Sequence, residues 1–133
     1  FSDCASLASA AIPDTVTSLG RYAFNKCTSL KSVTLGRGIT VIDSNTFSGC
    51  VALRKVEMQG AIAEINAYAF SDCNSLTSFT VPESVTDVNR SAFADCRRLK
   101  EILNKSSLSL SFSGGINVIT DSAESKITTD ANG

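Results

Sequence analysis

Phe24-Asn-Lys-Cys27-Thr-Ser-Leu30-Lys-Ser-Val33-Thr-Leu35 is the stretch that decides the fold of this chain. The same order of phenylalanine, cysteine and leucine recurs at a constant step of 23 residues. The repeated residues are Phe1, Phe24, Phe47, Phe70 and Phe93, then Cys4, Cys27, Cys50, Cys73 and Cys96, then Leu7, Leu30, Leu53, Leu76 and Leu99. All five cysteines of the chain share one position in the unit, so the recurrence is an internal repeat. Such a repeat predicts a solenoid of stacked coils.

Each unit contains one short segment with the alternation of a strand. In the second unit it is Ser32-Val33-Thr34-Leu35, where apolar residues stand at every second position. This alternation predicts a strand with one buried face. A turn with glycine or proline follows, and then a second apolar pair such as Ile39 and Ile42. We expect equivalent strands of successive coils to pair in parallel, about 4.8 Å apart, as one sheet.

The segment from each phenylalanine to the following leucine is too short for a full helix. Phenylalanine and cysteine stand three residues apart, which places them on one face of a helical turn. We therefore predict a single helical or 3₁₀ turn here. The predicted fold is a β-rich solenoid of about 4.5 coils with short helical or 3₁₀ turns.

The repeat divides the chain into three regions. Residues 1–104 carry the repeat, in units starting at the five phenylalanines. The pattern decays in residues 105–120, which we interpret as a C-terminal cap, built either as a small hairpin or as a degenerate coil. Residues 121–133 form a polar tail without periodicity, which we expect to fray. Because the chain starts at Phe1 within a unit, we expect it to be a piece of a longer protein.

Composition excludes several classes of function. With 12 basic and 13 acidic residues, the chain lacks the charge that nucleic acids or anionic membranes attract. It has no apolar run near the ~20 residues of a membrane span. It has no histidine, the commonest general base near neutral pH, and its serines and acidic residues show no paired arrangement. We expect no enzymatic activity and no cofactor.

The cysteine repeat does not indicate disulfides or a metal site. One cysteine per coil gives side chains that point the same way, whereas a disulfide needs two that face each other. The short Cys-x₂-Cys spacing of many metal sites is absent. We predict five reduced, buried thiols that pack as small hydrophobic groups. The phenylalanines are expected in the core, and Tyr22 and Tyr68 at an exposed corner, either packed over the coil edge or available for contact.

The outward positions of the strands form the candidate binding surface. A solenoid presents such positions as a regular array, and extended faces of this kind commonly bind partners. The candidate residues are Ser32, Thr34, Lys55, Glu57, Ser78 and Thr80. The alternative is that these side chains are merely solvated.

The repeated unit resembles a known family. The pattern Phe-x-x-Cys-x-x-Leu-x-x-Val-x-Leu-Pro-x-x-Val-x-x-Ile-Gly-x-x-Ala is similar to the BspA-like, Treponema-type class of leucine-rich repeat over residues 1 to about 104. The chain departs from it in three columns: proline occurs only at Pro13 and Pro82, glycine only at Gly20, and Thr46 replaces alanine.

The resemblance implies a leucine-rich-repeat solenoid with a parallel β-sheet on one face. It also implies a secreted or cell-surface protein of a bacterium or protist, with an adhesion-type role and a protein partner on a host or microbial surface. A passive spacer within a larger surface protein is the alternative. An accessory segment of an enzyme is a third.

Overall fold

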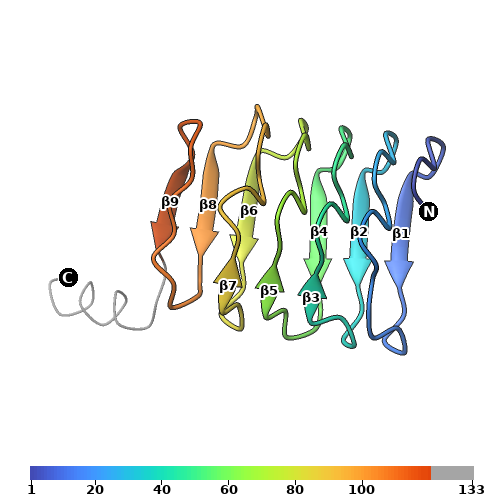
Figure 1. The fold of residues 1–133 in the computed structure, drawn as a ribbon, viewed down its shortest axis with the longest axis horizontal. Helices are drawn as coiled ribbons and strands as arrows, with labels where there is room; N and C mark the ends of the chain where they lie inside the picture. Colours follow the sequence, from blue (N-terminus) through green and yellow to red (C-terminus); the bar gives the residue numbers. More distant parts are fainter. Residues whose placement is uncertain (121–133) are drawn as a thin grey trace, which may run out of the picture.

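The computed structural model describes residues 1–120, and they wind into a solenoid of short strands and turns (Figure 1). The strands on one face have four residues each: β1 (Ser9–Ile12), β2 (Ser32–Leu35), β4 (Lys55–Met58), β6 (Ser78–Val81), β8 (Glu101–Asn104) and β9 (Asn117–Thr120). The second face has two-residue strands: β3 (Val41–Ile42), β5 (Glu64–Ile65) and β7 (Asp87–Val88). The predicted solenoid is confirmed. The polar tail predicted for 121–133 lies outside the described residues.

The strands pair in parallel, and the 23-residue period sets their register. Ser32 pairs with Lys55 on the first face, and Glu64 pairs with Asp87 on the second. The parallel pairing is confirmed, but the expectation of one continuous sheet on the long-strand face is wrong, because its strands form two sheets, β1-β2-β4 and β6-β8-β9. The short strands form a third sheet, β3-β5-β7. Figure 1 shows the wider spacing between β4 and β6, which we call the seam.

Two residues distinguish the fourth coil at the seam. In neighbouring coils a backbone N–H at the strand end crosses to the preceding coil, from Gln59 to Leu35 at 3.0 Å and from Lys105 to Val81 at 2.9 Å. Pro82 occupies this position in the fourth coil and has no N–H to donate to Met58. In addition, Phe79 fills a column that holds Val33 and Val56 in the two preceding coils.

The ladder is interrupted at the start of β6 as well. The N–H of Lys31 donates to Ala8, and that of Arg54 to Lys31, each at 2.8 Å. Within residues 1–120 no backbone bond joins the N–H of Thr77 to Arg54, the equivalent pair. The seam therefore lacks main-chain bonds at both ends of the strand.

The predicted helical or 3₁₀ turn is wrong: residues 1–120 contain no helix of either kind. At the Phe–Cys corner (residues 22–27 and their equivalents), N–H groups alternate between two kinds of acceptor. The N–H of Cys27 closes a turn on Phe24, at 3.2 Å. The N–H groups of Phe24 and Lys26 instead cross to Thr46 and Ser48 of the next coil, at 2.8 and 2.7 Å.

A left-handed backbone produces this alternation. Tyr22 and Lys26 have φ values of 62° and 59°. A helix needs consecutive right-handed residues, so two left-handed residues in this segment convert it into a series of turns. The column of Lys26 holds Gly49 in the third coil, where the left-handed conformation has little steric cost.

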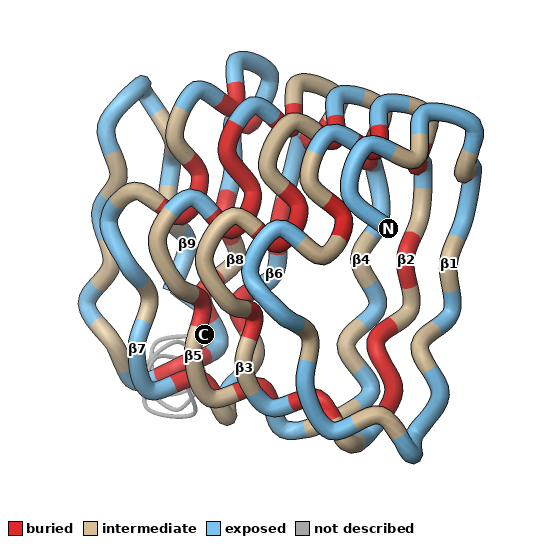
Figure 2. Tube along the Cα trace, turned by 45° about the vertical axis from the view of Figure 1, so that its right-hand side comes forward, coloured by how far each residue is buried: buried red, intermediate tan, exposed pale blue. Residues whose placement is uncertain are grey.

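The phenylalanines stack through the centre of the solenoid. Rings of successive coils lie 5.4 to 5.5 Å apart and nearly parallel from Phe1 to Phe93. Phe24, Phe47 and Phe70 are at most 1% exposed, whereas Phe1 is 75% exposed because its outer side has no neighbour among the described residues. Figure 2 shows the buried positions along the inside of the middle coils. Burying each phenylalanine contributes roughly 1.5–3 kcal/mol.

Candidate binding surfaces

The structure places the six predicted contact residues on the long-strand face, but on two different sheets. Ser32 and Thr34 of β2 lie in register with Lys55 and Glu57 of β4. The remaining two, on β6, lie across the seam; they are Ser78 and Thr80. The serine and threonine of β2 are half-buried, and the other four residues are exposed. The sequence predicted one array; the structure shows two patches.

The two charges on the β2–β4 part of this face are paired with each other. Lys55 Nζ lies 2.8 Å from Glu57 Oε1, and the Thr34 hydroxyl donates to Glu57 Oε2 at 3.4 Å. The hydrogen bond to Glu57 raises the pKa of Lys55 and lowers that of Glu57. Both side chains are largely open to solvent, so the pair adds little to stability. Its effect is to neutralise the two charges of the β2–β4 patch, while Glu101 of β8 remains a separate exposed charge on this face.

A cavity of about 180 Å³ opens at the seam. Its walls come from both sheets and include Arg54 and Met58 on one side and Phe79 and Thr80 on the other. The sequence analysis missed this feature. Pro82 was the available signal, because it is the only proline in a coil that has a preceding coil to bond with in residues 1–120.

The cysteine thiols form a ladder along the Phe–Cys corner. Cys50 Sγ donates to the Phe24 carbonyl at 3.1 Å, and Cys73 Sγ donates to the Phe47 carbonyl at 3.3 Å. Burial raises the pKa of Cys50 to about 12, so this thiol is protonated at neutral pH. All five cysteines are free. The prediction that all are buried is wrong for Cys4, which is half-buried in the first coil.

The thiol ladder does not assemble ligands for a metal. In the part of the chain that the structure describes, no three cysteine, aspartate or glutamate side chains converge on one point. The thiols are bound to main-chain carbonyls instead, which suits packing rather than coordination.

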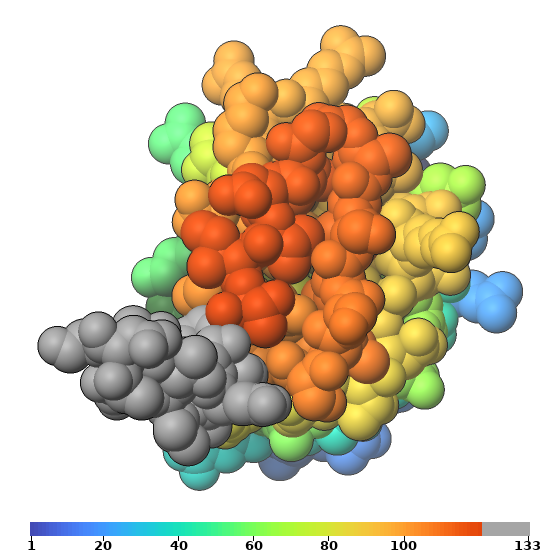
Figure 3. Space-filling model, turned by 90° about the vertical axis from the view of Figure 1, so that its left-hand side faces the viewer, coloured from blue at the N-terminus to red at the C-terminus, as the bar shows by residue number. Residues whose placement is uncertain are grey.

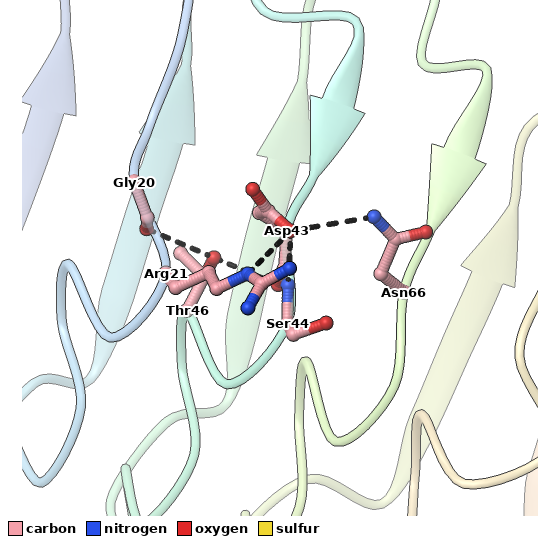
Figure 4. A network of polar contacts seen from close by, with 6 residues as sticks. All are labelled: Gly20, Arg21, Asp43, Ser44, Thr46 and Asn66. Carbon is pink, nitrogen blue, oxygen red and sulfur yellow. Dashed lines mark hydrogen bonds and ion pairs between the residues drawn. The ribbon is translucent and has the colours of Figure 1, made fainter.

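A polar network links the first three coils at a neighbouring corner (Figure 4). Asp43 Oδ1 accepts the Ser44 N–H at 2.7 Å and the Asn66 amide at 3.4 Å, and lies 3.9 Å from Arg21 Nε. Asp43 stands in the family's glycine column, and its hydrogen bonds hold the corner that glycine otherwise makes. This aspartate is therefore committed to structure.

Thr46, which replaces the family's alanine, is part of the same network. Its hydroxyl donates to the Asp43 carbonyl at 2.8 Å, and the side chain is 0% exposed. A buried hydroxyl with a partner is tolerated in a core. Tyr22 and Tyr68 are 51% and 47% exposed, so both residues remain available for contact.

Comparisons with known proteins agree with this geometry. A family model described as the BspA type leucine rich repeat region matches residues 1–121 in six copies. A search of curated proteins found no match.

Several solved structures are similar to the chain. A leucine-rich repeat protein from Bacteroides ovatus is 31% identical with a TM-score of 0.72, covering 86% of this chain and 31% of its own. A leucine rich cell surface protein from Faecalibacterium prausnitzii is 28% identical with a TM-score of 0.78, covering 93% of this chain and 34% of its own. The pneumococcal vaccine antigen PcpA, 19% identical with a TM-score of 0.78, covers 93% of this chain and 33% of its own, and shares the fold. The chain thus spans about a third of these relatives' lengths.

Proposed function

The chain belongs to the BspA type leucine-rich repeat family, and on that premise we propose that it is a protein-binding module of a secreted or cell-surface protein. The proposal rests mainly on the long-strand face, where side chains recur at one position in successive coils. Such an array suits a partner that contacts several coils at once.

The predicted contact residues form two patches in this proposal. The patch on β2 and β4 carries the Lys55–Glu57 pair, and the patch on β6 carries Ser78 and Thr80. Their chemistry is hydroxyl groups beside one neutralised ion pair. We expect weak affinity for each coil, with useful strength only where a longer solenoid engages many positions together.

A surface location is proposed from the relatives. The F. prausnitzii protein is named a cell surface protein, and PcpA is named a vaccine antigen. Residues 1–120 contain no helix that is long and apolar enough to cross a membrane. We carry the surface location over to this chain as a proposal, together with a host or microbial protein as the partner.

One observation favours a second candidate, a passive spacer. Lys55 and Glu57 satisfy each other, so the strand face has no free charge at its centre to attract a partner. A solenoid of this kind would hold other parts of a longer surface protein at a fixed distance. The two candidates differ in whether the face binds anything.

The test reverses a charge on the β2–β4 patch and introduces one on the β6 patch. The double variant Lys55→Glu with Thr80→Arg changes two exposed positions, so the fold should survive. The control, Thr40→Glu with Asp87→Arg, also reverses one charge and introduces another, at exposed positions on and beside the short strands, with the opposite change in net charge. Each protein is used to capture extracellular-matrix and serum proteins, and the amount bound is measured.

The binding proposal expects the double variant to lose capture while the control keeps it. Equal capture by the wild type and the double variant would exclude the strand face as the site. A wild type that captures nothing would favour the spacer.

A further inference from the structure

The last coil of the solenoid is shorter than the others. Between the fourth and fifth coils Ser78 pairs with Glu101, a step of 23 residues. In the last coil Glu101 pairs with Asn117, a step of only 16. The chain from β8 to β9 therefore returns to the sheet by a shorter path, as a parallel coil and not as a hairpin. This last coil has no Phe–Cys corner of its own.

The short coil leaves the fifth corner (residues 91–96) without its usual acceptors. One coil earlier, the N–H groups of Phe70 and Asp72 donate to the carbonyls of Ala92 and Ala94, at 2.8 and 2.9 Å. The equivalent N–H groups belong to Phe93 and Asp95, and no main-chain carbonyl within residues 1–120 accepts them. Figure 3 views this end of the solenoid: residues after 100 cover its centre, and side chains of the preceding coil project above them.

A cavity of about 290 Å³ lies at the uncovered corner. Phe112 from the short coil packs edge-on against Phe93, with ring centroids 5.5 Å apart, and so covers the end of the aromatic stack. Phe112 takes the place of the next phenylalanine of the stack, but the short coil supplies no carbonyl for the N–H groups of Phe93 and Asp95. Ser113 and Gly114 of the short coil also line the cavity.

The charge at this cavity is positive on balance. Arg90 and Arg97 line it, both are exposed, and neither pairs with an acidic side chain of the described residues. The Asp95 carboxylate also lines the cavity and offsets one of these charges. The N–H groups of Phe93 and Asp95, with the two arginines beside them, form a site for a ligand that carries carbonyl oxygens and negative charge.

We propose that the fifth corner binds an acidic peptide segment. In the stacked corners, the N–H groups equivalent to those of Phe93 and Asp95 donate to two carbonyls spaced two residues apart, as in Ala92 and Ala94. A third N–H also crosses to the next coil there, but its equivalent in the fifth corner, that of Ser91, already donates to Asn89 Oδ1 at 2.8 Å. A peptide backbone supplies carbonyls at this spacing, whereas the two oxygens of a single carboxylate are too close together to occupy both positions. Acidic side chains of the peptide pair with Arg90 and Arg97. The site is separate from the strand face and exists whether or not that face binds a partner.

The probe peptide is based on Ser91-Ala-Phe-Ala-Asp95. This segment supplies the carbonyls that accept the N–H groups of Phe70 and Asp72 in the fourth corner. An acetylated and amidated hexapeptide Ser-Ala-Glu-Ala-Asp-Gly keeps its small residues and replaces the phenylalanine, since Phe112 already covers Phe93. The neutral peptide Ser-Ala-Gln-Ala-Asn-Gly is the matched comparison. Binding is followed by NMR titration of the full chain, with the Phe93 and Asp95 amides as reporters.

We expect the acidic peptide to shift both reporter amides and to slow their hydrogen exchange. The double variant Arg90→Gln with Arg97→Gln should weaken binding about tenfold, because each exposed ion pair with the peptide contributes about a few-fold in affinity. Arg54→Gln removes an equally exposed arginine at the distant seam and should leave binding unchanged. Unchanged Phe70 amide exchange in each variant shows that the corner is still folded.

Three results would overturn the proposal. The acidic peptide could leave the reporters unmoved at millimolar concentration, or the neutral peptide could bind equally well. Reporter shifts that depend on protein concentration without peptide would identify a second copy of this chain as the occupant instead.

Discussion

The Phe–Cys corner and the long-strand face arise from the same 23-residue period, yet only the corner is continuous. At the corner, rings stack at 5.4 to 5.5 Å, and cross-coil bonds run from Phe24, Phe47 and Phe70. On the face, the ladder stops between β4 and β6. Side-chain period alone therefore does not make a continuous sheet, because each coil must also supply its backbone donors.

The largest expected effect comes from removing a ring in the middle of the corner. Phe70→Ala deletes a buried ring with neighbours on both sides and should lower the free energy of unfolding by about 3–5 kcal/mol. Leu53→Ala, also buried, should cost about 2–5 kcal/mol. Phe1→Ala serves as the control, since Phe1 is exposed and should matter much less. Urea unfolding measures all three, and equal losses at Phe1 and Phe70 would contradict the stack as a source of stability.

The second effect is a loss of stability at alkaline pH. The pKa of Cys50 rises from 9.0 to about 12 on folding, so the folded chain holds this proton where the unfolded chain releases it. Its contribution is complete below pH 9 and declines between pH 9 and 12, by roughly 1.4 kcal/mol for each pH unit. Burial also raises the pKa of Cys27, in the same direction.

Urea unfolding at several pH values tests this linkage. Cys50→Ala should reduce the slope above pH 9, whereas Val33→Ala truncates another buried side chain without removing a thiol and should keep it. A slope unchanged by Cys50→Ala would show that this thiol does not carry the effect.

A smaller effect concerns the seam. Pro82→Gln introduces an N–H where Gln59 has one in the preceding coil, and this N–H should donate to Met58. One hydrogen bond contributes about 1 kcal/mol, and losing proline offsets much of it through the unfolded state. The useful measurement is therefore hydrogen exchange of the new amide, which should be slow.

The matched control for the seam is Pro13→Gln. Pro13 stands in the same column of the first coil, where the described residues offer no preceding strand. Its new amide should exchange rapidly. If both new amides exchange rapidly, the missing donor is not what separates β4 from β6.

The smallest effect is expected on the strand face. Lys55→Ala and Glu57→Ala break an exposed pair that touches no buried group, so neither should shift the unfolding midpoint measurably. A clear loss of stability from either variant would mean that this face is more strongly coupled to the core than the structure indicates.

The sequence predicted most of the fold because one column pattern controls it. Strand β2 begins and ends at the predicted residues, Ser32 and Leu35, and the predicted core of phenylalanine, cysteine and leucine is buried in the middle coils. The helical turn was predicted wrongly because residues such as Tyr22 adopt a left-handed backbone conformation, which a tyrosine side chain does not indicate in the sequence. The hints of this conformation were Gly49 and the asparagine and aspartates of the same two columns, Asn45, Asp72 and Asp95, because these residue types adopt the left-handed region most readily.

The candidate sites were less predictable. The division of the six face residues between two sheets depends on Pro82 and Phe79, whose columns lie outside the array itself. Lys55 and Glu57 stand two residues apart on one strand, which allows them to pair, but the side-chain geometry was needed to show that they do. The open fifth corner depends on the register of β9, which a decayed repeat does not specify.

The central claim is that main-chain bonds run continuously through the corner and stop at the seam. Residue-resolved hydrogen exchange of the wild-type chain tests it most directly. The account predicts slow exchange for the corner amides of Phe47 and Phe70 and for the ladder amides of Arg54 and Lys100, with fast exchange at Thr77. A Thr77 amide as protected as that of Arg54 would show that β4 and β6 are paired and would contradict it.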